Sequence, residues 1–267
     1  MKMKNNEITM VVSDFDGTLL RGDMNVPSDK FYEILHDMLD NQIGFIAASG
    51  RQYPSLRKMM SDVEEKIGFI AENGSLVIWK GEIVHKCSIE RNCAMSIIEE
   101  LEKEQEADLY VSGVNNGYIT SCREPFLKAL DDAGMDVIAV KDFADVKEDI
   151  MKVSVIYRNQ IPNEVKERLK NKFGKEVSVL DSGKGWLDFI PKESGKGPAL
   201  KVLSEIAGFS LDKTVAFGDQ ENDISMFQTA KIGYAMDTAY DYVKEAADDT
   251  CEIVEDTLWN ALYEHAV

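Results

Sequence analysis

Val11-Val12-Ser13-Asp14-Phe15-Asp16-Gly17-Thr18-Leu19-Leu20 is the stretch from which the fold of this 267-residue chain can be worked out. Its beginning continues an apolar, β-branched run, Ile8 to Val12, that predicts a buried strand, and the Asp-x-Asp-Gly-Thr sequence predicts a sharp turn after it. Side chains alternate along an extended chain, so Asp14 and Asp16 can point the same way while Phe15 turns towards the core. Two carboxylates are thus delivered to the end of a strand, where open α/β sheets bind ligands.

Two neighbouring carboxylates repel each other unless a positive charge lies between them. A hard divalent cation such as Mg2+, which prefers oxygen ligands, is the simplest partner for this pair. An Asp-Gly turn that only ends a strand would explain the same residues, and the motif alone does not separate the two interpretations.

The composition is typical of a folded protein that binds neither nucleic acid nor lipid. Hydrophobic residues make up 44% and charged residues 29% of a chain long enough for one large core and a smaller second unit. The 48 acidic residues outnumber the 30 basic ones, and the formal charge of -18 repels nucleic acid phosphates and anionic membranes. An anionic substrate would therefore need positive charge within the site itself.

Cysteine usage and the N-terminal sequence predict a cytoplasmic protein. The cysteines show no CxxC pairing and no metal-finger spacing, so we expect free thiols in a reducing compartment at Cys87, Cys93, Cys122 and Cys251. The basic residues at positions 1–6 lead into an apolar run too short for a signal peptide, and no window has the apolar length that crosses a bilayer.

The first part of the chain alternates strands and helices. Ser28 is expected to cap a helix, and Phe45 to Ala48 predicts a second strand after it. Strand, helix, strand is a βαβ unit with parallel strands, so Ser49 should emerge at the same sheet edge as Asp14. The Ser49-Gly50-Arg51 turn offers a hydroxyl, backbone N–H groups and a guanidinium, which could together cradle an oxyanion.

The middle of the chain has a different pattern. A hairpin is predicted around Lys80-Gly81, and from about Ile89 to Leu187 the order becomes helix, strand, strand, helix, strand, helix, strand, strand. Met151 to Tyr157 is predicted to be a central strand with three side chains on one face, Val153, Val155 and Tyr157. A sheet with helices to one side is the α+β pattern, so this segment is interpreted as an inserted domain.

Alternation of helices and parallel strands returns in the last third. We predict a helix over Pro198 to Ala207, strands over Thr214 to Phe217 and Ile232 to Met236, and an acidic turn at Gly218 to Asp223. The predicted domains are a core made of residues 1–85 and 188–267, interrupted by an inserted domain at residues 86–187.

The carboxyl ends of parallel strands meet at one sheet edge, so Asp14, Asp16, Ser49 and Asp219 should lie together, with Lys196 reaching in from the start of its helix. A hard-cation site beside a lysine is what phosphoryl transfer requires. A carboxylate can attack phosphorus and form an aspartyl phosphate that water hydrolyses. Asp14 suits this nucleophilic role, and Asp16 could protonate the leaving alcohol and later deprotonate the water.

Four segments resemble, in order, the four motifs of the haloacid dehalogenase superfamily: Asp14 to Leu20, Ala48 to Arg51, Lys196-Gly197 and Gly218 to Asp223. Their spacing, the Glu72-Asn73-Gly74 turn and the position of the insert resemble the Cof-type branch with a type IIB cap. The resemblance implies a Rossmann-like parallel-sheet core with an inserted α+β cap. It also implies a Mg2+-dependent phosphatase of small phosphomonoesters, such as sugar phosphates or related metabolites.

The same resemblance assigns roles to the residues of the main motifs. Asp14 would be nucleophile and metal ligand, and Asp16 would be the general acid and base, with its backbone carbonyl also on the metal. Asp219 would complete the metal site. Ser49 and Lys196 would hold the phosphoryl group.

Further residues are secondary candidates by this resemblance. Gly50 and Asn222 would also contact phosphate, and Asp223 would support the metal or the phosphate. Thr18 would stabilise its turn through the hydroxyl, whereas Arg51 and Asn73 are equally compatible with a site role or a structural turn. The sequence Asp237-Thr238 departs from the Met-Gly-Asn-Ala that the family usually has after that strand, so the contact expected there is not carried over.

Three functions remain open on the sequence. The first is a phosphatase of small phosphorylated metabolites, and the second is a phosphomutase or other phosphotransferase that uses the same aspartyl phosphate. The third is a non-catalytic phospho-switch of the receiver type, which is the least favoured because receiver domains are much shorter and lack an inserted cap. The sequence defines neither the physiological substrate nor the oligomeric state.

Overall fold

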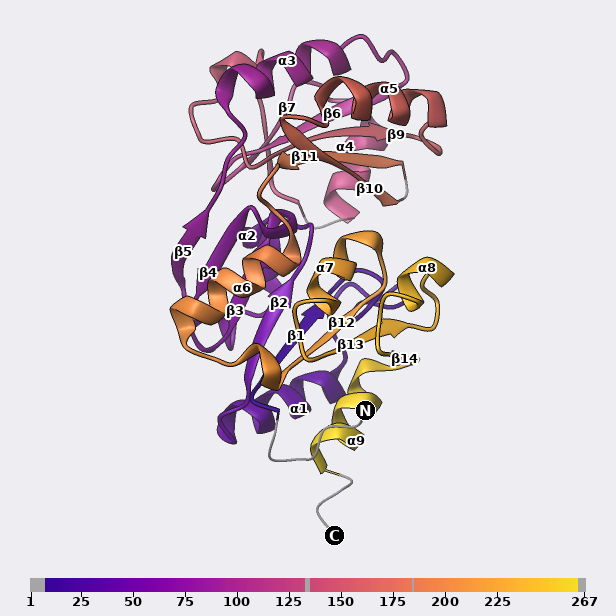
Figure 1. Ribbon diagram of the computed structural model, residues 1–267. Helices are drawn as coiled ribbons and strands as arrows, with labels where there is room; N and C mark the ends of the chain where they lie inside the picture. The colour runs from indigo at the N-terminus through magenta and orange to yellow at the C-terminus, as the bar shows by residue number, and fades with distance from the viewer. Residues whose placement is uncertain (1–7, 133–134, 184, 264–267) are drawn as a thin grey trace. The chain divides into compact units, whose positions relative to one another are not determined.

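The structure is a computed structural model that describes residues 8–132, 135–183 and 185–263. The sequence Ser182-Gly183-Lys184-Gly185 predicts a turn, and Lys184 of that turn lies outside the described residues. The chain divides into two compact units (Figure 1). Unit 1 comprises Met1–Ser49, Met59–His85 and Gly195–Val267, and unit 2 comprises Gly50–Lys58 and Lys86–Ser194. Within the described ranges, no helix combines the length and apolar character needed to cross a bilayer.

Unit 1 is built on an eight-stranded sheet of order β14-β13-β12-β1-β2-β3-β4-β5, in which β1 from the first third of the chain lies beside β12 from the last third (Figure 1). The pairs from β14 to β3 are parallel, and β4 runs antiparallel to β3. The strands are β1 Met10–Asp14, β2 Gly44–Ala48, β3 Gly68–Ala71, β4 Leu76–Trp79, β5 Glu82–Lys86, β12 Thr214–Gly218, β13 Ile232–Met236 and β14 Asp249–Cys251.

Helices cover both faces of this sheet because its strands are apolar on both sides. Met10 and Val12 of β1 belong to the apolar cluster formed with α6, α7 and α8, whereas Phe45 of β2 contacts Phe31 of α1, with ring centroids 5.4 Å apart. The helical spacing of Leu200, Leu203 and Ile206 predicts one apolar face for α6, and this prediction is wrong at Ile206, which is 50% exposed. The helices are α1 Asp29–Asp40, α6 Lys196–Ala207, α7 Ile224–Phe227, α8 Asp241–Lys244 and α9 Val254–Tyr263, with short 3-10 turns η1 Glu64–Lys66, η2 Glu72–Gly74, η4 Leu211–Lys213 and η5 Glu221–Asp223.

Unit 2 contains a six-stranded sheet of order β10-β11-β9-β6-β7-β8, which is antiparallel except for the β7-β8 pair. Its strands are β6 Ala107–Ser112, β7 Gly117–Ile119, β8 Val137–Ala139, β9 Lys152–Tyr157, β10 Val177–Gly183 and β11 Trp186–Pro191. The helices are α3 Arg91–Leu101, α4 Glu124–Asp132 and α5 Asn163–Phe173, with α2 Tyr53–Met59 at the unit boundary and the 3-10 turn η3 Phe143–Asp145.

The helices of unit 2 lie on both faces of its sheet, which corrects the prediction of helices to one side. Val153, Val155 and Tyr157 share one face as predicted, and they pack with α3 and α5. On the opposite face, Tyr110 and Ile156 pack with Phe126 and Leu130 of α4. The helix α4 therefore covers the apolar part of the second face.

The fold class predicted from the sequence is confirmed, with a parallel α/β core and a second, α+β unit. The strands β8 and β14 were not predicted. Each is three residues long, which is too short to show a period of two above the background of the neighbouring residues.

Glu255, at the start of α9, holds together three segments of unit 1. Its carboxylate accepts hydrogen bonds from Arg21 at 2.9 and 3.1 Å and from Ser28 at 2.5 Å, and the Ser28 hydroxyl accepts one from the N–H of Phe31 as the N-cap of α1. Burial alone would raise the pKa of Glu255, but these hydrogen bonds outweigh burial and hold the pKa below its ordinary value.

We expect Glu255→Gln to lower the free energy of unfolding at neutral pH by about 1–3 kcal/mol, the usual cost of leaving buried charged partners unmatched. Because the folded-state pKa is depressed, this stabilisation is complete above pH 4.5, the ordinary pKa of a glutamate. It is lost as the pH falls through the lower pKa of the folded state. Urea unfolding of both proteins at neutral pH and well below 4.5 measures the difference. A difference that persists in acid would contradict the role of the ionised carboxylate, and the exposed Asp256→Asn serves as the control.

Candidate active site

The sheet of unit 1 brings three acidic or polar strand ends together. Asp14 is the last residue of β1 and lies opposite Ala48 of β2, so Ser49 continues from the neighbouring strand at the same edge. On the other side of β1, the strand β12 ends at Gly218, immediately before Asp219. This placement agrees with the prediction from parallel strand order.

Lys196 lies between two carboxylates at the centre of this edge. Its Nζ donates to Asp14 Oδ1 at 2.5 Å and to Asp223 Oδ1 at 2.6 Å, and the Lys196 and Asp223 side chains are fully buried. Burial alone would lower the pKa of Lys196, but the two carboxylates raise it, so the side chain stays protonated. A fixed positive charge is thereby built into the site.

The carboxyl groups of Asp14 and Asp219 near Lys196 have raised pKa values. Burial, with the nearby charges of Asp223, Asp219 and Asp16, raises the pKa of Asp14 well above its ordinary value despite the opposing effect of Lys196. Burial and the charge of Asp223 likewise raise the pKa of Asp219 to about 6. The folded protein therefore gathers negative charge that the lysine alone does not neutralise.

Asp219 is oriented by the turn that follows β1. Thr18 donates its hydroxyl to Asp219 Oδ1 at 3.1 Å, and Gln220 Nε2 donates to Oδ2 at 2.8 Å. Gly17 has a φ of +90°, and a Cβ atom there would lie 2.2 Å from Asp219 Oδ2. Only glycine allows the turn to approach the carboxylate this closely.

Asp223 anchors the loop that carries Asp219. Its Oδ2 accepts hydrogen bonds from the backbone N–H groups of Asp219 at 2.9 Å and Gln220 at 3.0 Å, while Oδ1 holds Lys196. This double role was not predicted. The reciprocal capping of η5 by Gln220 and Asp223 is a local signal that could have indicated it.

The Glu72-Asn73-Gly74 turn connects Ser49 with Asn222. The N–H of Asn73 donates to the carbonyl of Ser49 at 3.1 Å, and Asn222 Nδ2 donates to Asn73 Oδ1 at 2.8 Å. The φ angles of all three turn residues are positive, and a Cβ on Gly74 would lie 2.3 Å from the carbonyl oxygen of Gly195. The turn therefore supports both the residue before Lys196 and the loop after β2.

The remaining predicted residues lie at the margins of this cluster. Asp16 follows Asp14 in the same turn and is exposed, and Phe15 between them is fully buried as predicted. Gly50 and Arg51 continue the loop from Ser49 into unit 2, where the Gly50 carbonyl accepts a hydrogen bond from Lys152 Nζ at 2.6 Å.

The donor set of this edge fits a divalent cation. Single oxygens of Asp14, Asp219 and Asp223 lie within 4.8 Å of one another, and all three residues are buried. Asp14 Oδ2 is buried without a hydrogen-bond partner among the described residues. Such an oxygen is costly unless a cation or another partner binds it, and hard cations prefer carboxylate oxygens. The side chain of Asp16 does not belong to this group of three carboxylates. The resemblance implies a metal contact through the backbone carbonyl of Asp16, which stays a prediction.

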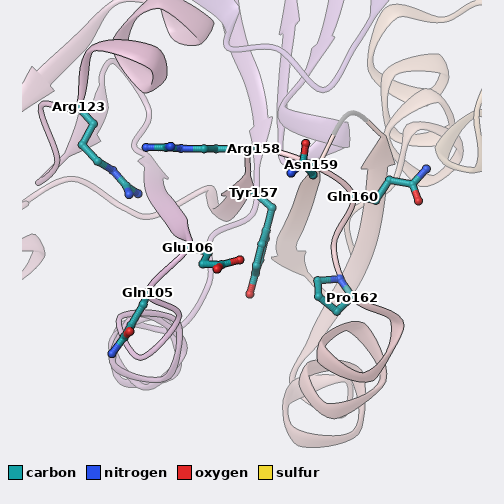
Figure 2. Close-up of a pocket in the computed structure, with 8 residues that line it drawn as sticks. All are labelled: Gln105, Glu106, Arg123, Tyr157, Arg158, Asn159, Gln160 and Pro162. Atoms are coloured by element: carbon teal, nitrogen blue, oxygen red, sulfur yellow. The ribbon is translucent and has the colours of Figure 1, made fainter.

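A cavity of about 480 Å3 in unit 2 contains none of the predicted site residues. Figure 2 shows its lining, which includes Tyr157, Arg158 and Arg123. Arg123 is held there by Asp108, with 2.6 Å between Nη2 and Oδ1, and by the carbonyl of Ala107. The predicted residues Asp14, Lys196 and Asp219 belong to unit 1 and do not line this cavity.

A parallel α/β core that presents Asp-x-Asp, a serine, a buried lysine and a second acidic turn at one sheet edge defines a phosphoryl-transfer enzyme. The family model of the haloacid dehalogenase-like hydrolases matches residues 11–261, and the chain belongs to this family. The match confirms the resemblance found in the sequence. It identifies the chain as an enzyme of the phosphatase type rather than a receiver-type switch.

Two curated relatives match this chain in sequence along most of their length. The 5-amino-6-(5-phospho-D-ribitylamino)uracil phosphatase YbjI of Escherichia coli is 27% identical over 90% of this chain and 89% of its own. The 5-amino-6-(5-phospho-D-ribitylamino)uracil phosphatase YcsE of Bacillus subtilis is 26% identical over 91% and 89%, respectively. Among solved structures, SMU.1108c of Streptococcus mutans is similar to this chain with a TM-score of 0.86. The two are 29% identical over 96% of this chain and 99% of that one.

We expect the affinity of the protein for a divalent cation to rise with pH. Below about 6 the carboxyl of Asp219 holds a proton that a cation must displace, and the raised pKa of Asp14 extends this competition to higher pH. Thermal unfolding with and without added cation should therefore show a larger rise in Tm above pH 6 than below it. Asp219→Asn should abolish most of the rise, and a shift that is equal at both pH values would contradict the assignment.

Proposed function

We propose that this protein is a Mg2+-dependent phosphatase that hydrolyses small phosphomonoesters through an aspartyl phosphate on Asp14. The observation that carries the proposal is the position of Asp14 at the end of a buried strand, with Oδ1 held by Lys196 and Oδ2 left without a hydrogen-bond partner among the described residues. A carboxylate fixed in this way is oriented for in-line attack on phosphorus.

The first step transfers the phosphoryl group to Asp14. An oxygen of the Asp14 carboxylate forms a bond to phosphorus, and the bond from phosphorus to the substrate's alcohol oxygen breaks. The departing oxygen takes a proton from Asp16, which is exposed and therefore accessible to the leaving group. Ser49, Gly50 and Asn222 hold the phosphoryl oxygens.

The second step returns the enzyme to its starting state. Asp16, now ionised, takes a proton from a water molecule as the water oxygen attacks phosphorus, and the bond between phosphorus and Asp14 breaks to release phosphate. Lys196 keeps its charge through both steps because Asp223 holds it. Transfer to water rather than to a sugar hydroxyl is what separates this reaction from the phosphomutase alternative.

The cation would be held by Asp14, Asp219 and the backbone carbonyl of Asp16, with Asp223 in support. When bound, Mg2+ neutralises charge on the phosphoryl oxygens and on the carboxylates that surround them. The residues of this chain supply the nucleophile, the proton and the fixed lysine.

The substrate class we propose is a phosphorylated sugar, sugar alcohol or related metabolite, selected by an inserted cap at residues 86–187. Support comes from the names of the two curated relatives, each of which describes a phosphatase of a phosphorylated ribityl compound.

The four cysteines are free thiols, as expected for the cytoplasmic location that the sequence predicts.

We expect Asp14→Asn to abolish release of inorganic phosphate across a panel of phosphorylated metabolites with Mg2+, because an amide cannot serve as the nucleophile. Activity should also be lost with chelator. Asp241→Asn removes a carboxylate that is 94% exposed and should leave turnover unchanged. A folded Asp14→Asn variant that retains turnover would contradict the nucleophile assignment.

We expect Asp16→Asn to separate the two proton transfers. For alkyl phosphates, kcat/KM should fall by about 10²–10⁴-fold, the usual contribution of general acid catalysis. For 4-nitrophenyl phosphate the fall should be smaller, since its leaving group needs little protonation, and stopped-flow should show a burst of about one equivalent of nitrophenol before slow turnover. An equal fall in kcat/KM for both substrates would contradict the general-acid role, and Asp23→Asn, in the same loop region and exposed, is the control.

A further inference from the structure

One end of the second face of the unit 2 sheet is polar and buried. Ser112 of β6 and Lys152 of β9 are directly paired across adjacent antiparallel strands, so their side chains lie on the same face. Ser112 is fully buried and Lys152 is 2% exposed. Burying a lysine side chain on a sheet lowers stability unless its ammonium group has hydrogen-bond partners. The partners of Lys152 and Ser112 therefore indicate why these polar residues are buried.

Both residues bind the loop that follows Ser49. Lys152 Nζ donates to the carbonyl oxygen of Gly50 at 2.6 Å, and Gln52 Nε2 donates to Ser112 Oγ at 3.1 Å. Gln52 is itself only 3% exposed. One cross-strand pair thus holds the segment from Gly50 to Gln52 at two points.

These contacts determine where two backbone N–H groups point. In a planar trans peptide, the carbonyl of one residue and the N–H of the next point in opposite directions, and the described residues contain no cis peptide bond. The hydrogen bond from Asn73 to the Ser49 carbonyl therefore orients the N–H of Gly50. The hydrogen bond from Lys152 to the Gly50 carbonyl orients the N–H of Arg51 in the same way.

We propose that Lys152 and Ser112 are positioning residues for phosphate binding. They fix the peptide between Gly50 and Arg51, which holds the N–H of Arg51 ready for the phosphoryl oxygens. Asn73 orients the N–H of Gly50 next to it, and two successive backbone N–H groups are an arrangement that binds anions elsewhere in proteins. The inference rests on the proposed function, because it explains how the loop with Ser49 and Gly50 would hold its phosphate. The role proposed for Lys152 and Ser112 does not depend on the leaving group.

The test compares Lys152→Met with Lys152→Arg. The methionine variant should raise the inhibition constants of inorganic phosphate and orthovanadate by about tenfold or more, the loss expected for a hydrogen bond from a charged donor. It should lower kcat/KM by a similar factor for every phosphomonoester, whatever its leaving group, and the arginine variant should recover most of the loss. Unchanged inhibition constants would overturn the inference, as would a loss confined to certain leaving groups.

Two serines provide a matched comparison if Lys152→Met does not fold. Ser112 and Ser154 are both fully buried and lie on the same sheet face, but Ser154 Oγ donates to Asp188 at 2.6 Å instead of contacting the loop. Ser112→Ala should raise the inhibition constant of phosphate and Ser154→Ala should not, so equal effects would overturn the inference. A wild-type protein that releases no phosphate contradicts the proposed function, whereas an active wild type with unaffected Lys152 and Ser112 variants contradicts only this inference.

Discussion

The buried ion pairs of Lys196 are the constraint on which the rest of unit 1 depends. A lysine with no exposed surface requires compensating charge, and here it comes from two carboxylates in different parts of the sequence, Asp14 and Asp223. The ammonium group thereby fixes the end of β1, the start of α6 and the loop after β12 relative to one another. Removing either carboxylate would leave a buried charge unmatched, so the geometry of the site and the stability of the core are linked.

Close backbone approaches help to hold the loops around this ion pair. Gly17 allows its turn to meet the Asp219 carboxylate, and Gly74 allows the positive-φ turn at residues 72–74 to meet the backbone of Gly195. Asn73 adopts a positive φ that costs energy, and its hydrogen bonds to Ser49 and Asn222 offset that cost. Backbone strain at these positions is therefore balanced by contacts among the residues proposed to bind phosphate.

The parallel core and its acidic edge were predictable because they depend on local patterns and one topological rule. Runs of apolar residues marked β1, β2, β12 and β13, and parallel order then placed Asp14, Ser49 and Asp219 together. The contact of Asp223 with Lys196 was beyond prediction because it spans 27 positions, whereas the capping of η5 by Asp223 has a local sequence signal. The short strands β8 and β14 and the opposite-face position of α4 were missed for a related reason: long-range packing decides them, and a few residues of sequence do not.

The polar end of the unit 2 sheet shows most clearly why alternation alone misleads. Along β9, Val153 and Val155 alternate with Lys152 and Ser154, a pattern typical of a strand with one face in solvent. Yet every residue of this strand is buried. Burying a lysine and serines lowers stability unless each finds hydrogen-bond partners, and an apolar face would satisfy packing more simply. Polar residues at these positions are accounted for by what they bind, and for Lys152 and Ser112 that is the loop which continues from Ser49.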